Sequence, residues 1–121
     1  MAKRILAVDD SKTMRDMVSF TLSKAGFEVN VAEDGKGALA VLGGGKFDLI
    51  ITDLNMPVMD GITLIKNVRS SAQHRGVPIL ILTTESDGAK KAEGKAAGAT
   101  GWLVKPFSPE KLVELVQRVC P

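Results

Sequence analysis

Cysteine is almost absent from this sequence. Cys120 is the only cysteine among 121 residues, so no disulfide can form within the chain. Such scarcity fits the reducing cytoplasm, where disulfides are rare. Because Cys120 stands next to the last residue, we expect an incidental terminal side chain there rather than a catalytic thiol.

Long apolar runs and a large excess of one charge are also missing. No stretch approaches the roughly 18 consecutive apolar residues that a membrane helix needs. The first apolar run stops at Asp9 and Asp10, where a signal peptide would continue. The net charge is only +2, and we expect Lys90, Lys91 and Lys95 on one solvated helix face. A cytoplasmic protein that binds neither membrane nor nucleic acid is therefore predicted.

The composition that remains is that of an ordinary globular protein, with 45% hydrophobic and 25% charged residues. A chain of 121 residues fits one compact domain. No linker, internal repeat or low-complexity segment divides it. We expect a single domain over residues 1–121, present as a monomer.

Short β-rich apolar runs alternate with stretches of helical periodicity. The predicted strands are residues 4–8, 28–32, 49–52, 78–82 and 101–104. Apolar residues recur at helical spacing between and after them, for example at Leu112, Leu115, Val116 and Val119. Strict alternation of this kind predicts an α/β fold with five helices and a five-stranded, doubly wound parallel sheet.

The fourth predicted helix differs from the others. Its sequence AKKAEGKAAGA offers only alanine as apolar material and carries Gly94 inside. A glycine in a helix interior is about 1 kcal/mol less favourable than alanine. We expect this helix to be loosely held, as elements that move in a switch often are.

Polar residues follow the predicted strands at one rim of the sheet, where ligands of open parallel sheets bind. Asp9 and Asp10 follow the first strand, Asp53 the third, Thr83 the fourth and Lys105 the fifth. Each alone has an ordinary explanation as a helix cap, a turn residue or a surface lysine. Together, the three carboxylates would repel one another unless a cation neutralised them.

Magnesium is the cation that this set of residues favours. It is a hard ion that takes oxygen ligands and also binds phosphate oxygens. Asp10 and Asp53 are the expected direct ligands, and Asp9 acts either directly or through water. The backbone carbonyl of Asn55, in the loop after Asp53, would complete the set.

A carboxylate beside such a cation can attack phosphorus and form an acyl phosphate. Asp53 is the expected phosphoryl acceptor, with Lys105 pairing with the transferred group. The Thr83 hydroxyl would bond to that group only after transfer, and this difference between the two states can drive a conformational change. His74, the only histidine, is expected to be a solvated loop residue, so the phosphodonor must be another molecule.

The whole pattern resembles the receiver domain of two-component response regulators. The resemblance rests on Asp9-Asp10, the segment Asp53-Leu-Asn-Met-Pro-Val-Met-Asp-Gly61, Thr83 and Lys105-Pro106, in that order over essentially the whole chain. The stretch TTESDGAKKAEGKAAGATGWLVKPF is most similar to the stand-alone chemotaxis regulators of the CheY type. The resemblance implies a flavodoxin-like sheet with strand order 2-1-3-4-5.

The resemblance also implies a function. Asp53 would be phosphorylated from a phosphohistidine of a chemotaxis-type histidine kinase, with Mg²⁺ required and a phosphatase as a further partner. Output would pass through the fourth helix, fifth strand and fifth helix to the flagellar motor switch protein, with Trp102 at the family's aromatic switch position. A cis bond at Lys105-Pro106 is implied as well. Trp102, where tyrosine is frequent, and Thr84, where a smaller residue often sits, depart from the commonest pattern and bear on output.

Three other functions compete with that of a motor-binding response regulator. A haloacid-dehalogenase-type phosphatase would need an acid two residues after its nucleophile, but Asn55 stands there and cannot donate a proton. A nucleotide-binding module is suggested only by Gly35-Lys-Gly37, beside the repelling charges of Glu33 and Asp34. A phosphate sink in a chemotaxis phosphorelay stays open, because a sink and a motor-binding regulator share these residues.

Overall fold

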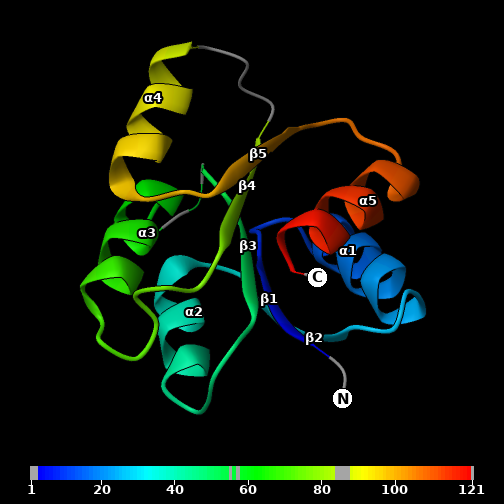
Figure 1. The fold of residues 1–121 in the computed structure, drawn as a ribbon, viewed down its shortest axis with the longest axis horizontal. Helices are drawn as coiled ribbons and strands as arrows, with labels where there is room; N and C mark the ends of the chain where they lie inside the picture. Colours follow the sequence, from blue (N-terminus) through cyan, green and yellow to red (C-terminus); the bar gives the residue numbers. More distant parts are fainter. Residues whose placement is uncertain (1–2, 55, 57, 84–87, 121) are drawn as a thin grey trace.

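The computed structural model describes residues 3–54, 56, 58–83 and 88–120, and the side chains of 88–90 are not described. Five strands alternate with five helices in this part of the chain (Figure 1). In chain order they are β1 (Arg4–Val8), α1 (Lys12–Lys24), β2 (Glu28–Ala32), α2 (Gly35–Leu42), β3 (Leu49–Asp53), α3 (Gly61–Ser70), β4 (Ile79–Thr83), α4 (Gly88–Ala97), β5 (Gly101–Val104) and α5 (Pro109–Val119).

All five predicted strands are confirmed, and two of them differ at an end. β3 runs one residue further, to Asp53, which pairs with Leu82 of β4. β4 begins at Ile79 rather than at Pro78. Proline has no N–H to donate to a neighbouring strand, so Pro78 contributes only its carbonyl, which accepts from the Ile50 N–H at 3.0 Å.

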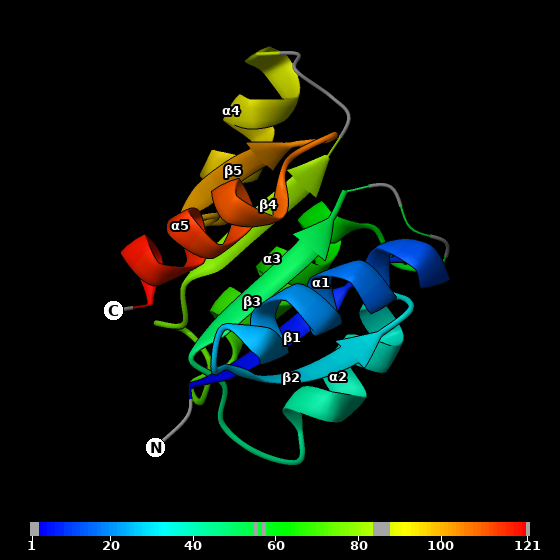
Figure 2. The same ribbon diagram turned by 90° about the vertical axis from the view of Figure 1, so that its right-hand side faces the viewer.

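The strands form one parallel sheet in the order β2-β1-β3-β4-β5, which is the order that the resemblance implies. Figure 2 shows the strand arrows running in the same general direction. Their carboxyl ends therefore lie at one edge of the sheet, and every residue that directly follows a strand starts from that edge.

Helices cover both faces of the sheet. α1 and α5 lie on one side, and α2, α3 and α4 lie on the other (Figures 1 and 2). Successive residues of β1 alternate between the two cores: Ile5 and Ala7 pack with α1 and α5, whereas Leu6 and Val8 pack on the opposite face. This explains the uninterrupted apolar runs of β1, β3 and β4, because both faces of these strands are buried.

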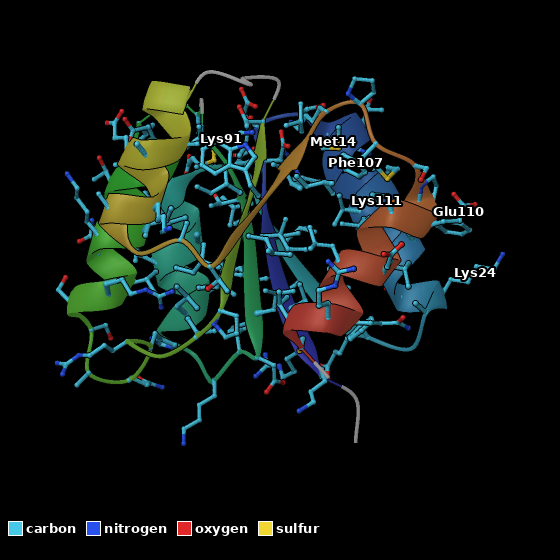
Figure 3. The ribbon with its side chains drawn as sticks, turned by 45° about the horizontal axis from the view of Figure 1, so that its top comes forward. Met14, Lys24, Lys91, Phe107, Glu110 and Lys111 are labelled. Atoms are coloured by element: carbon cyan, nitrogen blue, oxygen red, sulfur yellow. The ribbon has the colours of Figure 1, made fainter. Side chains whose placement is uncertain are left out.

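Aromatic and thioether side chains extend the core on the α1 and α5 side. Met14 of α1 and Phe107, in the connection from β5 to α5, pack against the same cluster as Leu112. Figure 3 labels both on this side of the sheet, across from Lys91 of α4. The outer helices of the two faces differ in packing: α5 buries Leu112 and Val116 fully, whereas the described side chains at 91–93 and 95–96 of α4 are exposed.

The expectation that α4 is loosely held is only partly right. Its outer residues, such as Lys91 and Lys95, are exposed as expected. Its C-terminal end, however, is bound by Arg69 of α3, whose Nε and Nη2 donate to the Gly98 carbonyl at 3.0 and 2.8 Å. The Nη1 atom of Arg69 also donates to the Val77 carbonyl at 2.6 Å, just before β4. One guanidinium thus ties α4 to the base of the sheet.

The prediction that His74 is a solvated loop residue is wrong. Its side chain is buried, and its Nε2 atom lies 3.1 Å from the Gly45 carbonyl oxygen. The tertiary structure explains this burial. The loop after α2 leads into β3 and the loop after α3 leads into β4, and because these strands are parallel neighbours, the two loops meet at the amino end of the sheet. Cys120 is buried too, and burial raises the pKa of its thiol, in agreement with an unreactive side chain.

Within the described residues, no helix is both long and apolar enough to cross a membrane.

The N-cap of α5 provides a test of the fold. Ser108 accepts a hydrogen bond from the Lys111 N–H at 3.1 Å, so Ser108→Ala should lower the free energy of unfolding by about 1 kcal/mol. Urea unfolding followed by far-UV circular dichroism measures this loss. Ser70→Ala is the matched control: the Ser70 hydroxyl bonds only to carbonyls of its own helix, so its removal should leave stability nearly unchanged. Equal effects of the two substitutions would contradict the capping role.

Candidate functional site

Four of the predicted site residues meet at the carboxyl edge of the sheet. Asp9 and Asp10 directly follow β1, Asp53 ends β3, and Lys105 directly follows β5. The neighbouring strands bring them together although Asp9 and Lys105 are 96 positions apart in the chain. The convergence expected from the positions after each strand is therefore confirmed for these four.

The three aspartates form a compact acidic cluster. Asp9, Asp10 and Asp53 each offer a carboxylate oxygen, and these oxygens all lie within 4.8 Å of one another. Asp9 is 3% exposed and Asp53 is 8% exposed, whereas Asp10 is open to solvent. Carboxylates held this close repel one another, so a cation with a preference for oxygen ligands would stabilise them. The cluster is thus able to hold a metal ion.

Lys105 supplies one positive charge beside this cluster. Its Nζ atom lies 2.9 Å from Asp9 Oδ2 and 3.7 Å from Asp53 Oδ2. The lysine backbone is fixed as well, because its N–H donates to the Thr83 carbonyl at 2.7 Å. The expected cis bond between Lys105 and Pro106 is confirmed.

The two carboxylate oxygens of Asp53 have different environments. Oδ1 accepts a hydrogen bond from the Leu54 N–H at 2.9 Å, and Oδ2 faces Lys105. Burial raises the pKa of Asp53, and the charges of Asp9 and Asp10 raise it further, while Lys105 and the Leu54 N–H act in the opposite direction. The net effect is a raised pKa because removal from water outweighs the single nearby ammonium.

Asp9 is held from several sides. Its Oδ1 accepts from the Ser11 N–H at 2.9 Å while its Oδ2 accepts from Lys105. Ser11 in turn caps α1, and its hydroxyl accepts from the Met14 N–H at 3.2 Å. The Asp9 carbonyl accepts from Arg15 Nη1 at 2.8 Å. Sequence reasoning missed Arg15, whose only signal is its place in the first turns of the helix that starts beside the acidic pair.

Thr83 and Trp102 lie on the next two strands of the sheet, Thr83 at the end of β4 and Trp102 inside β5. Thr83 is fully buried at the end of β4, one residue beyond Leu82, the partner of Asp53. Trp102 pairs with Ile81 and is half-buried against the core on the α4 side. Because residues two apart on a strand share a face, Thr83, Ile81 and Trp102 face the same side of the sheet. Asn55 and Thr84 lie outside the described residues.

Comparisons with known proteins agree with this geometry. A model of the response regulator receiver domain matches residues 5–117. Chemotaxis protein CheY-3 of Vibrio cholerae is 40% identical over 117 residues, covering 96% of this chain and 90% of that protein. Chemotaxis protein CheY of Pseudomonas aeruginosa is also 40% identical, covering 96% and 94% of the two chains.

The fold is also similar to that of solved structures. The chemotaxis response regulator CheY4 of Vibrio cholerae superposes with a TM-score of 0.95 at 55% sequence identity, covering 98% of this chain and 99% of that one. Receiver domains of this type are signalling switches rather than conventional enzymes. With an acidic cluster, a lysine and a five-stranded sheet in the order 2-1-3-4-5, this chain belongs to the response regulator receiver domain family.

Proposed function

We propose that this protein is a chemotaxis response regulator in which Asp53 accepts a phosphoryl group from a histidine kinase in a Mg²⁺-dependent reaction. The observation that carries the proposal is the buried Asp53 carboxylate, which lies within 4.8 Å of two other carboxylates and 3.7 Å from the ammonium of Lys105. Similarity to the chemotaxis proteins of Vibrio cholerae and Pseudomonas aeruginosa supports the chemotaxis assignment.

The transfer step follows from the chemistry of the carboxylate. An oxygen of Asp53 forms a bond to the phosphorus of the donor phosphohistidine while the phosphorus–nitrogen bond breaks, and the imidazole leaves with that electron pair. The Leu54 N–H holds Oδ1 in place, so the carboxylate keeps one orientation during attack. Lys105 pairs with the incoming phosphoryl oxygens, exchanging one anionic partner for another.

Asp10 and Asp53 fit the direct ligands of Mg²⁺, with the backbone carbonyl of Asn55 as a third. Asp9 already accepts hydrogen bonds on both oxygens, from Ser11 and from Lys105, which favours a role through a bound water. When bound, Mg²⁺ supplies positive charge that offsets the repulsion between the carboxylates and the phosphoryl oxygens.

Output depends on contacts that differ between the two states. The Thr83 hydroxyl would bond to the phosphoryl group, and Trp102, on the same face of the sheet, would respond to the movement of β4 and its loop. The proposed partners are a chemotaxis-type histidine kinase, the flagellar motor switch protein and a phosphatase. Without a partner, we expect self-phosphorylation from small donors and slow autodephosphorylation only.

The acceptor role predicts a specific mass change. Acetyl phosphate with Mg²⁺ should add one phosphoryl group to the wild-type chain, and Asp53→Ala should abolish the addition because it removes the carboxylate that forms the acyl phosphate. Intact-mass spectrometry measures both.

Asp16→Ala is the matched control for that experiment. Asp16 is an exposed aspartate on α1 that is paired with Lys12 at 2.7 Å and is not a member of the acidic cluster, so this variant should be phosphorylated like the wild type. A modification that persists in Asp53→Ala would show that the acceptor is another residue.

The raised pKa of Asp53 predicts an effect on stability. In the absence of divalent cations, Asp53→Asn should raise the free energy of unfolding at pH 7, because it removes a buried charge whose pKa is raised mainly by desolvation. A raised pKa means that the folded state binds this proton at a pH where the unfolded state has lost it. The contribution of Asp53 therefore becomes more favourable as pH falls, and the advantage of Asp53→Asn should shrink towards acid pH.

Urea unfolding in EDTA across the pH range measures this difference. Asp16→Asn, at an exposed surface pair, should change stability little and without the same pH dependence. If Asp53→Asn is less stable than the wild type at neutral pH in EDTA, the carboxylate is a net stabilising group and the electrostatic account is wrong.

Target binding separates a motor regulator from a phosphate sink. Beryllofluoride with Mg²⁺, which imitates the phosphorylated aspartate, should increase capture of purified flagellar motor switch protein by the wild type and not by Asp53→Ala. Capture that is equal with and without beryllofluoride, or absent in both, would count against motor output and favour a sink or another target.

A further inference from the structure

Gly94 lies in the middle of α4 and is buried, although the residues around it on the helix are exposed. A methyl group on Gly94 would lie 2.8 Å from Trp102 Cζ3 and 2.7 Å from Ile81 Cδ1. Both distances are shorter than real Cβ atoms approach. The glycine therefore allows α4 to lie directly against the indole ring, which the sequence pattern alone presents only as a weak point in the helix.

The indole of Trp102 lies in an inward position, against the core beneath α4. Apolar packing favours this position, and burial of the indole N–H opposes it. The ring packs against the core cluster that includes Ile81, on the α4 side of the sheet. Its Nε1 atom is buried, and within the described part of the chain no hydrogen-bond partner reaches it. An unpaired buried N–H is unfavourable, so apolar contact has to offset it. The contact with Gly94 is a part of that offset.

If a side chain were added at Gly94, the indole of Trp102 is the neighbouring group that could move aside. Arg69 fixes the C-terminal end of α4 through the Gly98 carbonyl, which opposes a shift of the helix away from the sheet. Ile81 is fully buried. Trp102, in contrast, is half-buried and lines a surface groove of about 280 Å³ between α4 and β5, into which its ring can turn.

We propose that Gly94 is a positioning residue for Trp102. Because Gly94 has no side chain, the indole ring can occupy the inward position against α4, which a larger residue would block. The consequence for signalling rests on the proposed function, in which Trp102 responds to phosphorylation. Because Thr83 lies two residues beyond Ile81 on the same face, a change at the end of β4 reaches the group formed by Ile81, Trp102 and Gly94 through direct neighbours.

Substitution of Gly94 by alanine tests the proposal without any phosphoryl group. Alanine is the better helix former, so Gly94→Ala should raise the urea midpoint if the space beside Trp102 is unimportant. We expect instead that the midpoint does not rise, that the emission of Trp102 shifts to longer wavelength, and that acrylamide quenches it more strongly. Trp102 is the only tryptophan, so the emission reports this ring alone.

Gly37→Ala is the matched control, because it makes the same change in a helix where a methyl group meets nothing closer than 3.4 Å. This variant should raise the urea midpoint and leave the Trp102 emission unchanged. Gly94→Ala with unchanged emission and a raised midpoint would overturn the proposal.

A double-mutant cycle keeps the test valid even if Gly94→Ala folds poorly. Trp102→Leu removes the ring atoms that the new methyl group would meet. The effect of Gly94→Ala on the urea midpoint, followed by circular dichroism, should then be more favourable in the Trp102→Leu background than in the wild type. Additive effects would show that Gly94 and Trp102 are not coupled, against the proposal.

Beryllofluoride with Mg²⁺ connects the two proposals and separates their failures. If phosphorylation moves Trp102, the emission change should be smaller in Gly94→Ala than in the wild type, because the ring has already been displaced. If beryllofluoride does not change the wild-type emission, the proposed switch role of Trp102 is wrong. The positioning role of Gly94 is decided by the emission and the coupling measured without a phosphoryl group.

Discussion

The ammonium of Lys105 lies 2.9 Å from one buried carboxylate and 3.7 Å from another, and the functional edge of the molecule depends on this arrangement. Two buried carboxylates and a third nearby would repel one another strongly, and one lysine offsets only a part of that repulsion. The pKa of Asp53 is raised, mainly because burial removes its carboxylate from water and further because Asp9 and Asp10 add negative charge. The carboxyl edge of the sheet is therefore suited to bind a further cation. It also suits an anionic group that takes the place of a carboxylate as the partner of Lys105.

The sheet explains how such an unfavourable cluster is maintained. Asp9 directly follows β1 and Asp53 ends β3, and the buried apolar side chains of these strands pack against helices on both faces. The free energy of that burial keeps the carboxylates in place. Local hydrogen bonds then orient them, from Ser11 to Asp9 and from Leu54 to Asp53, so the acceptor is held in a defined position before any ligand arrives.

The α4 side of the molecule is built differently, and the difference suits a switch. α5 buries leucine and valine deeply, whereas α4 rests on the sheet through Gly94 and is tied at its end by Arg69. Few buried apolar contacts hold the exposed turns of α4, so these turns are weakly held although the C-terminal end is fixed. The rigid edge that carries the acidic cluster and the sparsely packed helix are thus joined by β4 and β5, which contribute Thr83 and Trp102.

The sequence by itself determined the strands, their parallel arrangement and the four polar residues that meet at one edge, because apolar periodicity and the residues after each strand are local signals. Resemblance to a known family added the strand order and the cis bond at Lys105. Only the tertiary structure decided that His74 is buried, that Arg15 and Arg69 bind backbone carbonyls, and that Gly94 contacts Trp102. Each of these depends on how loops and helices from distant parts of the chain pack together, and no periodicity in a single segment records that packing.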